Sequence, residues 1–92
     1  MSYGYSPKFD GPALAAFRSL EVWLQEAVLD EVDVILNSVP APDVAQRLRP
    51  DVTIHDFSRT AGGVEHVVFL TTVLDVPARL LHIRRIGRTR RP

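Results

Sequence analysis

Residues 20–37, Leu-Glu-Val-Trp-Leu-Gln-Glu-Ala-Val-Leu-Asp-Glu-Val-Asp-Val-Ile-Leu-Asn, carry the strongest helical pattern in the sequence. Their apolar side chains recur at steps of three and four residues: Leu20, Leu24, Ala27, Val28, Val32, Ile35 and Leu36. On a helix such spacing forms one apolar face, and the intervening acidic residues form a solvated one. We interpret Trp23 as a core residue, and Pro40 and Pro42 as the end of this helix.

Upstream of this helix the sequence predicts a strand and a shorter helix. Residues 2–6, Ser-Tyr-Gly-Tyr-Ser, place two aromatic side chains on one face of an extended segment that ends at Pro7. Asp10 and Pro12 are residue types typical of an N-cap and a first helical turn, so a helix should begin there. Ser19 is expected to end this helix and to cap the longer one.

Downstream of a proline-flanked linker, residues 40–50, the apolar period changes from 3.6 to 2. Strands are expected at residues 52–57, 65–73 and 80–86, separated by turns at 58–63 and 75–78, with Gly87 ending the last strand. Short loops make these strands an antiparallel meander, and the two helices must cover one of its faces. The prediction is an α+β fold in the order β-α-α-β-β-β: an N-terminal strand, a two-helix hairpin and a three-stranded antiparallel meander.

Length and composition set further limits. The 92 residues suit one compact domain spanning residues 1–92. The sequence has no cysteine, which excludes disulfides and thiolate chemistry. No apolar run reaches the roughly 18–20 residues of a membrane span, and the N-terminus lacks the pattern of a signal peptide. We therefore expect a cytoplasmic protein without a membrane partner.

The net charge of zero conceals a segregation of charge along the chain. Residues 79–92 contain six arginines and no acidic residue, whereas residues 1–78 contain all 11 acidic side chains. A clustered cationic surface attracts phosphate or carboxylate groups, so this end should meet an anionic partner. The alternative is a solvated basic tail without a specific partner.

The three histidines, His55, His66 and His82, all fall on predicted strands. No helical His-Glu-x-x-His spacing is present, so we expect no metal and no cofactor. A zinc site built from three histidines on adjacent strands is an alternative, and so is a structural role for each histidine. Alternation predicts two runs of side chains that share a strand face: His66, Val68, Leu70 and Thr72, and His82, Arg84 and Ile86.

Histidines and arginines together suit RNA chemistry. Guanidinium groups bind phosphates in bidentate fashion, and imidazole exchanges protons near neutral pH. RNA cleavage through its own 2′-OH needs a base, an acid and cations around the phosphorane, and these two residue types supply all three. The candidate phosphate-binding residues are Arg59 on the predicted turn and Arg84, Arg88, Arg90 and Arg91 on or after the last strand.

The sequence resembles the RelE/ParE superfamily of bacterial type II toxins along nearly the whole chain. The segments that carry the resemblance are the helix 20–37 with Ser38-Val39-Pro40, Val44–Leu48, His55-Asp-Phe, the turn to Gly63, Glu65–Phe69 and Leu81–Arg88. Glu65–Phe69 resembles a family strand of the form Arg-Val-(Ile/Val)-Tyr. Leu81–Arg88 resembles an apolar strand that ends in Gly-(His/Lys)-Arg. The resemblance implies the same β-α-α-β-β-β fold.

The resemblance also implies a function. Members of this superfamily are toxins held inactive by a cognate antitoxin, in a toxin–antitoxin hetero-oligomer. The RelE branch cuts mRNA on the ribosome and the ParE branch inhibits DNA gyrase. We expect a ribosome-dependent, metal-independent mRNA endonuclease with an antitoxin, the ribosome and mRNA as partners. The alternatives are a non-catalytic gyrase inhibitor and a detoxified paralogue that acts only through protein interaction.

Candidate catalytic residues follow from the same resemblance. His66 falls where RNA-cutting members commonly have Arg, and His55 where they often have Lys or another polar group. Arg85 falls on the basic end of the last strand. The sequence lacks the C-terminal Tyr, Lys or His of several RNA-cutting members, and Lys8 is its only lysine. Either histidine carries the proton transfers here, or this chain does not cleave RNA.

Overall fold

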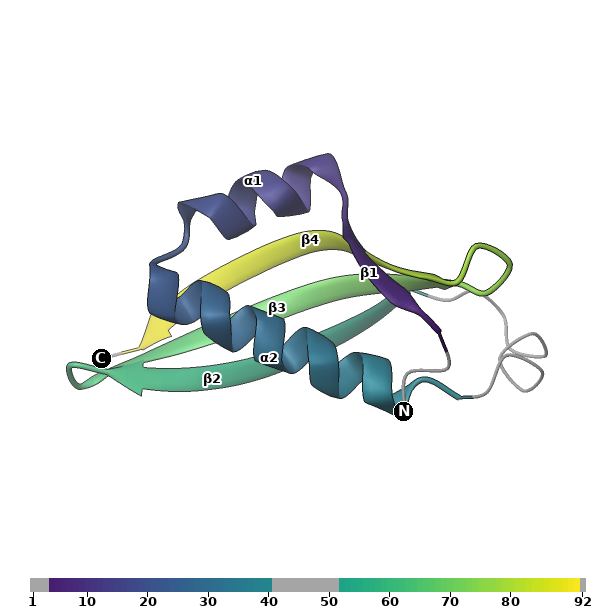
Figure 1. Cartoon of the computed structure of the whole chain (residues 1–92). Helices are drawn as coiled ribbons and strands as arrows, with labels where there is room; N and C mark the ends of the chain where they lie inside the picture. The colour runs from purple at the N-terminus through teal and green to yellow at the C-terminus, as the bar shows by residue number, and fades with distance from the viewer. Residues whose placement is uncertain (1–3, 41–51, 92) are drawn as a thin grey trace.

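The structure, a computed structural model, describes residues 4–40 and 52–91. The elements are β1 (Ser6–Phe9), α1 (Gly11–Ser19), α2 (Val22–Ser38), β2 (Val52–Ala61), β3 (Val64–Asp75) and β4 (Leu80–Arg91). This order confirms the predicted β-α-α-β-β-β fold (Figure 1). The expected family segment at residues 44–48 and most of the linker lie outside the described residues.

The four strands form one sheet in the order β1-β4-β3-β2. β2, β3 and β4 make the expected antiparallel meander, and β1 joins it in parallel beside the first part of β4. Both helices cover the same face of the sheet, with α2 lying along the strands and α1 over β4 (Figure 1). Neither described helix combines the length and hydrophobicity needed to span a membrane.

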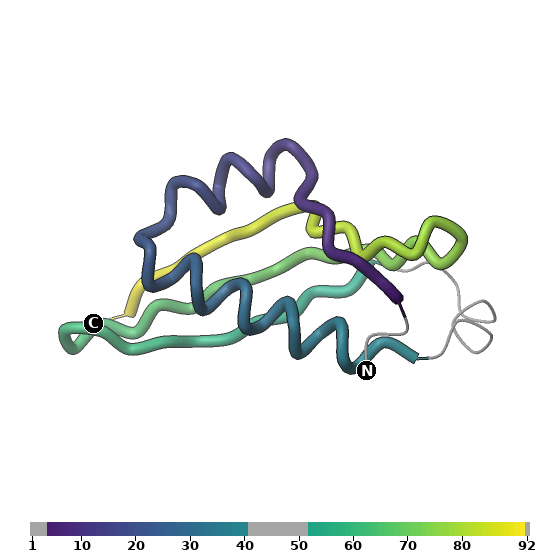
Figure 2. Tube along the Cα trace, in the orientation of Figure 1, coloured from purple at the N-terminus to yellow at the C-terminus, as the bar shows by residue number. Residues whose placement is uncertain are grey.

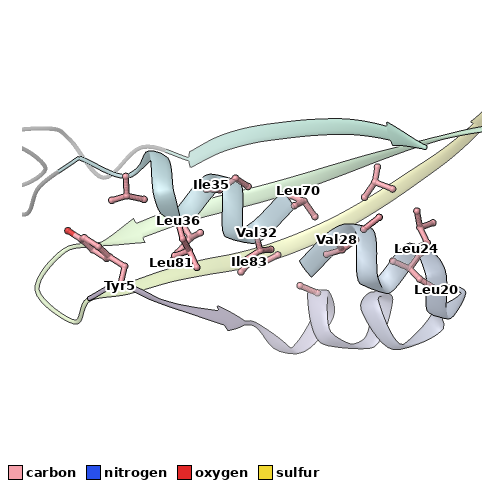
Figure 3. Packing of buried hydrophobic residues seen from close by; sticks show 14 residues of the cluster. Tyr5, Leu20, Leu24, Val28, Val32, Ile35, Leu36, Leu70, Leu81 and Ile83 are labelled. Atoms are coloured by element: carbon pink, nitrogen blue, oxygen red, sulfur yellow. The ribbon is translucent and has the colours of Figure 1, made fainter. Parts of the chain in front are cut away.

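The core lies between α2 and the two central strands (Figure 3). Leu24, Val28 and Val32, on the predicted apolar face of α2, are fully or almost fully buried. They meet Leu70 of β3 and Ile83 of β4, which are also fully buried. Burial of apolar surface is the main favourable term in folding, so this face of α2 holds the helix against the sheet.

The ends of the N-terminal elements differ from their predicted positions. β1 covers Ser6–Phe9 and includes Pro7, where the predicted strand was to end; residues 2 and 3 of that predicted strand lie outside the described residues. Proline is tolerated there because β1 is an edge strand that pairs only with β4. Ser19 does not cap α2: its hydroxyl donates to the Ala16 carbonyl at 2.7 Å, and the N-cap residue of α2 is Glu21.

The strands are longer than predicted. β2 continues to Ala61, so the turn to β3 contains only Gly62 and Gly63, whose φ angles are +58° and +76°. Two residues with positive φ match the hairpin turn that fits twisted strands. β4 does not stop at Gly87 but runs to Arg91, pairing with β3 throughout (Figure 2). The arginine-rich segment as far as Arg91 is therefore part of the sheet and not a solvated tail.

A register shift between β3 and β4 changes which side chains share a face. Thr71 pairs with Arg85, but its neighbour Thr72 pairs with Ile83, so Arg84 is an extra residue in β4. Such a bulge breaks the simple alternation of side chains along a strand. The expectation that His82, Arg84 and Ile86 share one side was therefore wrong.

Candidate functional site

The strand register divides the histidines and arginines between the two faces of the sheet. The helix-covered face carries Arg59, His66 and Arg90 in one row, because His66 is paired with Arg59 on β2 and with Arg90 on β4. Arg88 lies on the same face, opposite the buried Val68. We call Arg59, His66, Arg88 and Arg90 the basic row; three strands contribute to it.

His66 is buried at the centre of the basic row. Its exposed fraction is 8%, and Trp23 of α2 packs edge-on against it with ring centroids 5.1 Å apart. His66 Nδ1 is buried and has no hydrogen-bond partner among the described residues. Trp23 is 38% exposed, so it is a partly exposed cover over His66, and its interpretation as a core residue was wrong.

Glu21, the residue before α2, binds two arginines of the basic row. Arg88 Nη1 donates to Glu21 Oε2, and Arg90 Nη2 lies 3.6 Å from Glu21 Oε1. A backbone hydrogen bond at Glu21, together with Arg88 and Arg90, lowers the pKa of its carboxyl group. The acidic helical layer and the basic strand end therefore meet within one molecule.

Arg59 is the third arginine of the row. Its Nη1 donates to the carbonyl of Ser58 at 2.9 Å, and its guanidinium lies 5.2 Å from the centroid of the Phe57 ring. Among the described residues, no carboxylate lies within ion-pair distance of Arg59. Its side chain is exposed and can accept an anion without breaking an ion pair that the structure describes.

His82 belongs to a separate polar group on the opposite face, which the helices leave open. His82 Nδ1 lies 3.2 Å from Asp10 Oδ1, and His82 Nε2 lies 3.8 Å from Asp75 Oδ2. Arg84 Nε is 3.9 Å from the other Asp10 oxygen. Asp10 occupies the N-cap position of α1, as predicted, but makes no side-chain cap bond, because its carboxylate ties the start of α1 to β4.

The three candidate catalytic residues are not brought together. His55 shares the helix-covered face with His66 but lies opposite Leu70, four residues along β3 and therefore about 13 Å away. It borders a cavity of about 200 Å³ between the end of α2 and the sheet. Arg85 pairs with Thr71 and points to the open face.

The structure also places Arg91 and tests the alternative zinc site. Arg91 lies 3.6 Å from Glu65 at the end of the sheet. His82 is on the opposite face from His55 and His66, so these histidines cannot form the alternative three-histidine zinc site. The described part of the chain holds no group of three or more His, Asp or Glu side chains placed to bind a metal.

Sequence reasoning missed two residues of this site, Glu21 and the covering role of Trp23. Glu21 precedes α2, and Trp23 lies in its first turn. The sequence pattern alone does not distinguish Glu21 from the acidic residues within the helix. The available signal was position: an acidic residue just before a helix lies at one end of the helix, where it can meet another element. That signal did not identify Arg88 and Arg90 as its partners.

Comparison with known proteins supports the fold. No protein-family model matches the sequence, and no curated protein matches it either. A chain in the crystal structure of the intact E. coli RelBE toxin–antitoxin complex matches with a TM-score of 0.60 and 20% sequence identity. The match covers 95% of this chain and 99% of that chain, so the protein has a RelE-like fold along nearly its whole length.

Proposed function

We propose that this protein is the toxin of a type II toxin–antitoxin system and that it inhibits translation by cutting mRNA on the ribosome. The observation that carries the proposal is the basic row, with Arg59, His66 and Arg90 side by side on three strands. Likeness of fold to a chain of the RelBE complex supports the toxin assignment. The protein would act in the cytoplasm, where mRNA is translated.

The basic row suits the chemistry of RNA cleavage. Arg59 and Arg90 would bind the scissile phosphate and stabilise the charge that develops on its oxygens. His66, between them, would take the proton of the ribose 2′-OH as its oxygen attacks phosphorus. The P–O bond to the 5′ oxygen then breaks, and that oxygen leaves with a proton from water. The step needs Trp23 to move, because it covers His66.

A cognate antitoxin would silence the toxin by covering the basic row. Arg90 and Arg59 are exposed, and an acidic segment of the antitoxin would bind them as Glu21 binds Arg88 and Arg90 within the chain. Arg84, Arg85 and Arg91 lie away from the row and remain candidates for contacts with ribosomal RNA. His55 and Arg85 remain predicted catalytic residues without a place in the row.

One observation favours a second candidate, a non-catalytic inhibitor that binds DNA gyrase. His66 is 8% exposed, and Arg85 is on the opposite face, so neither of these two candidate catalytic residues is openly accessible next to the arginines. A toxin that only binds its target needs the exposed arginines but no proton transfer. The two candidates therefore differ in whether His66 matters.

Induced expression separates these functions. The chain, His66→Gln and Arg90→Gln are each expressed with and without the neighbouring reading frame, with mapping of mRNA ends and measurement of plasmid supercoiling. We expect growth arrest and new mRNA ends with the native chain, both lost in the two variants and both suppressed by an acidic neighbour. Arrest with altered supercoiling and intact mRNA would favour gyrase, and unaffected growth would refute a toxin role.

A further inference from the structure

The contact between Glu21 and the basic row has the geometry of a bound phosphate. Each oxygen of one carboxylate faces a different guanidinium: Oε2 faces Arg88 and Oε1 faces Arg90. Arg88 and Arg90 are two residues apart on β4, so both point to the same face of the sheet. Arginine pairs of this kind bind carboxylate and phosphate oxygens alike.

We propose that Glu21 occupies an RNA phosphate site and that the first turn of α2 is a latch. In this inference, which rests on the proposed function, an RNA phosphate replaces the Glu21 carboxylate on Arg88 and Arg90. The released turn then carries Trp23 away from His66. The binding site is thus closed until a phosphate arrives.

A phosphate in solution can reach the contact between Glu21 and the two arginines and compete with the carboxylate. The side chain of Glu21 is 43% exposed and that of Arg90 is 57% exposed, so a phosphate can reach both. Arg59 lies two strands from Arg90 in the same row, makes no ion pair with any carboxylate that the structure describes, and can bind a second phosphate of the strand. Exposed ion pairs are weak, whereas an RNA strand gains from Arg88 and Arg90 on one phosphate and from Arg59 on a second.

The side chain of Glu21 does not cap the helix that it precedes. Its side chain makes no cap hydrogen bond to α2, although its position would allow one. Asp30 and Asp33, further along α2, have no basic partner within ion-pair distance among the described residues. The side chain of Glu21 therefore pairs with Arg88 and Arg90 and not with the N–H groups of α2.

The same turn links Glu21 to Trp23. The Leu24 N–H donates to the Glu21 carbonyl at 2.9 Å, so Glu21 and Trp23 belong to one hydrogen-bonded turn. Leu24 is fully buried and fixes the helix from that point on. Val22, between Glu21 and Trp23, is 68% exposed and therefore contributes little buried apolar surface. Unwinding of residues 21–23 would break the hydrogen bonds from the Leu24 and Gln25 N–H groups to the Glu21 carbonyl but would leave Leu20 and Leu24 in the core, and Trp23 would move with Glu21.

The sequence supplies its own probe, because Trp23 is the only tryptophan. Quenching of its fluorescence by acrylamide measures how exposed the indole is. The native chain is compared with Glu21→Gln, which removes the competing charge, and with Asp30→Asn, a matched control that removes one acidic charge elsewhere on α2. Affinity for a fluorescein-labelled oligouridine is measured by anisotropy, and far-UV circular dichroism checks that each variant is folded.

We expect Glu21→Gln to bind the oligouridine about 3- to 10-fold more tightly than Asp30→Asn does. Its tryptophan should be quenched more strongly without RNA. Inorganic phosphate should raise quenching in the native chain relative to chloride at equal ionic strength. These three results together support the latch.

The other outcomes overturn it in distinguishable ways. RNA binding that is equal in Glu21→Gln and Asp30→Asn refutes the phosphate site but leaves the proposed RNA function standing. Tighter binding with unchanged quenching refutes the latch, because Trp23 then stays in place. Absence of RNA binding in all three proteins refutes both the inference and the RNA function on which it rests.

Discussion

Replacing Arg90 by glutamine should reduce the salt dependence of RNA binding, whereas replacing Arg85 by glutamine should not. Arg90 is in the basic row on the helix-covered face, and Arg85 points to the open face. An RNA backbone that follows the row meets three guanidinium groups, those of Arg59, Arg88 and Arg90. Arg88 and Arg90 share one phosphate in the proposed complex and Arg59 binds a second, so the condensed cations of two phosphates are displaced.

The size of the effect follows from this count. Single-stranded RNA gives a slope of about −0.7 in log K against log salt for each phosphate neutralised, so two phosphates give about −1.4. Glu21 recruits a cation when it leaves Arg88 and Arg90, and this offsets part of the slope in the native chain. Arg90→Gln should make the slope shallower by at most about 0.7, because Arg88 still contacts the shared phosphate, and Arg85→Gln should leave the slope unchanged.

The assay is fluorescence anisotropy of a labelled oligouridine at several NaCl concentrations between roughly 50 and 200 mM. Equal changes of slope in Arg90→Gln and Arg85→Gln would refute the reasoning, because RNA would then contact both faces of the sheet. A slope near −4 for the native chain would also refute the reasoning, because it would require about six neutralised phosphates, more than the basic row can contact.

Three further predictions concern the scaffold. Leu70→Ala should lower the free energy of unfolding by about 2–5 kcal/mol, because Leu70 is fully buried in the core; Ile54→Ala, at an exposed position, should change it by less than about 0.5 kcal/mol in the same urea titration. The carboxyl of Glu21 has a lowered pKa in the folded chain, so its contribution to stability is present above the unfolded value of 4.5 and is lost as the pH falls through the folded value. The difference in Tm between the native chain and Glu21→Gln should therefore shrink below pH 4.5, and a constant difference would contradict the ion-pair assignment. Gly63→Ala should cost about 1 kcal/mol because Gly63 has a φ of +76°, whereas Gly87→Ala meets open space without positive φ and should have a smaller effect in thermal unfolding.

The helical part of the fold was predictable because its signal is local. The apolar positions of α2 recur every three or four residues, and Leu24, Val28 and Val32 are buried as that spacing predicts. The helix ends were less well predicted. Ser19 and Glu21 both precede the helix, and Glu21 pairs with Arg88 and Arg90, which lie far away in the sequence and which no local pattern connects to it.

The strand faces were harder to predict because they depend on pairing between distant residues. The extra residue Arg84 reverses the alternation between His82 and Ile86, and no local pattern in residues 80–86 marks it. The extension of β4 beyond Gly87 has a similar cause. A glycine weakens an isolated strand, but here β3 supplies hydrogen bonds on past it to Arg91.

The candidate site was predictable in composition but not in arrangement. Arg59, His66, Arg88 and Arg90 were all identified from their residue types. They form one row because of the register between β2 and β3 and the register between β3 and β4. The β3–β4 register also puts Arg85 on the opposite face from His66. The burial of His66 beneath Trp23 depends on where α2 crosses the sheet, which a single sequence does not reveal.

The position of β4 inside the sheet has a consequence for how the protein is made. Ser6 pairs with Leu80, and Arg90 completes the basic row with His66. Neither the pairing of β1 nor the basic row can therefore form before β4 has been synthesised. A ribosome that synthesises the chain from its N-terminus therefore exposes β1, α1 and α2 well before their sheet exists. Contacts between residues so far apart in the sequence form slowly during folding. Because the arginine row forms only after β4 has emerged, the proposed activity would be absent while β1, α1, α2, β2 and β3 are being made.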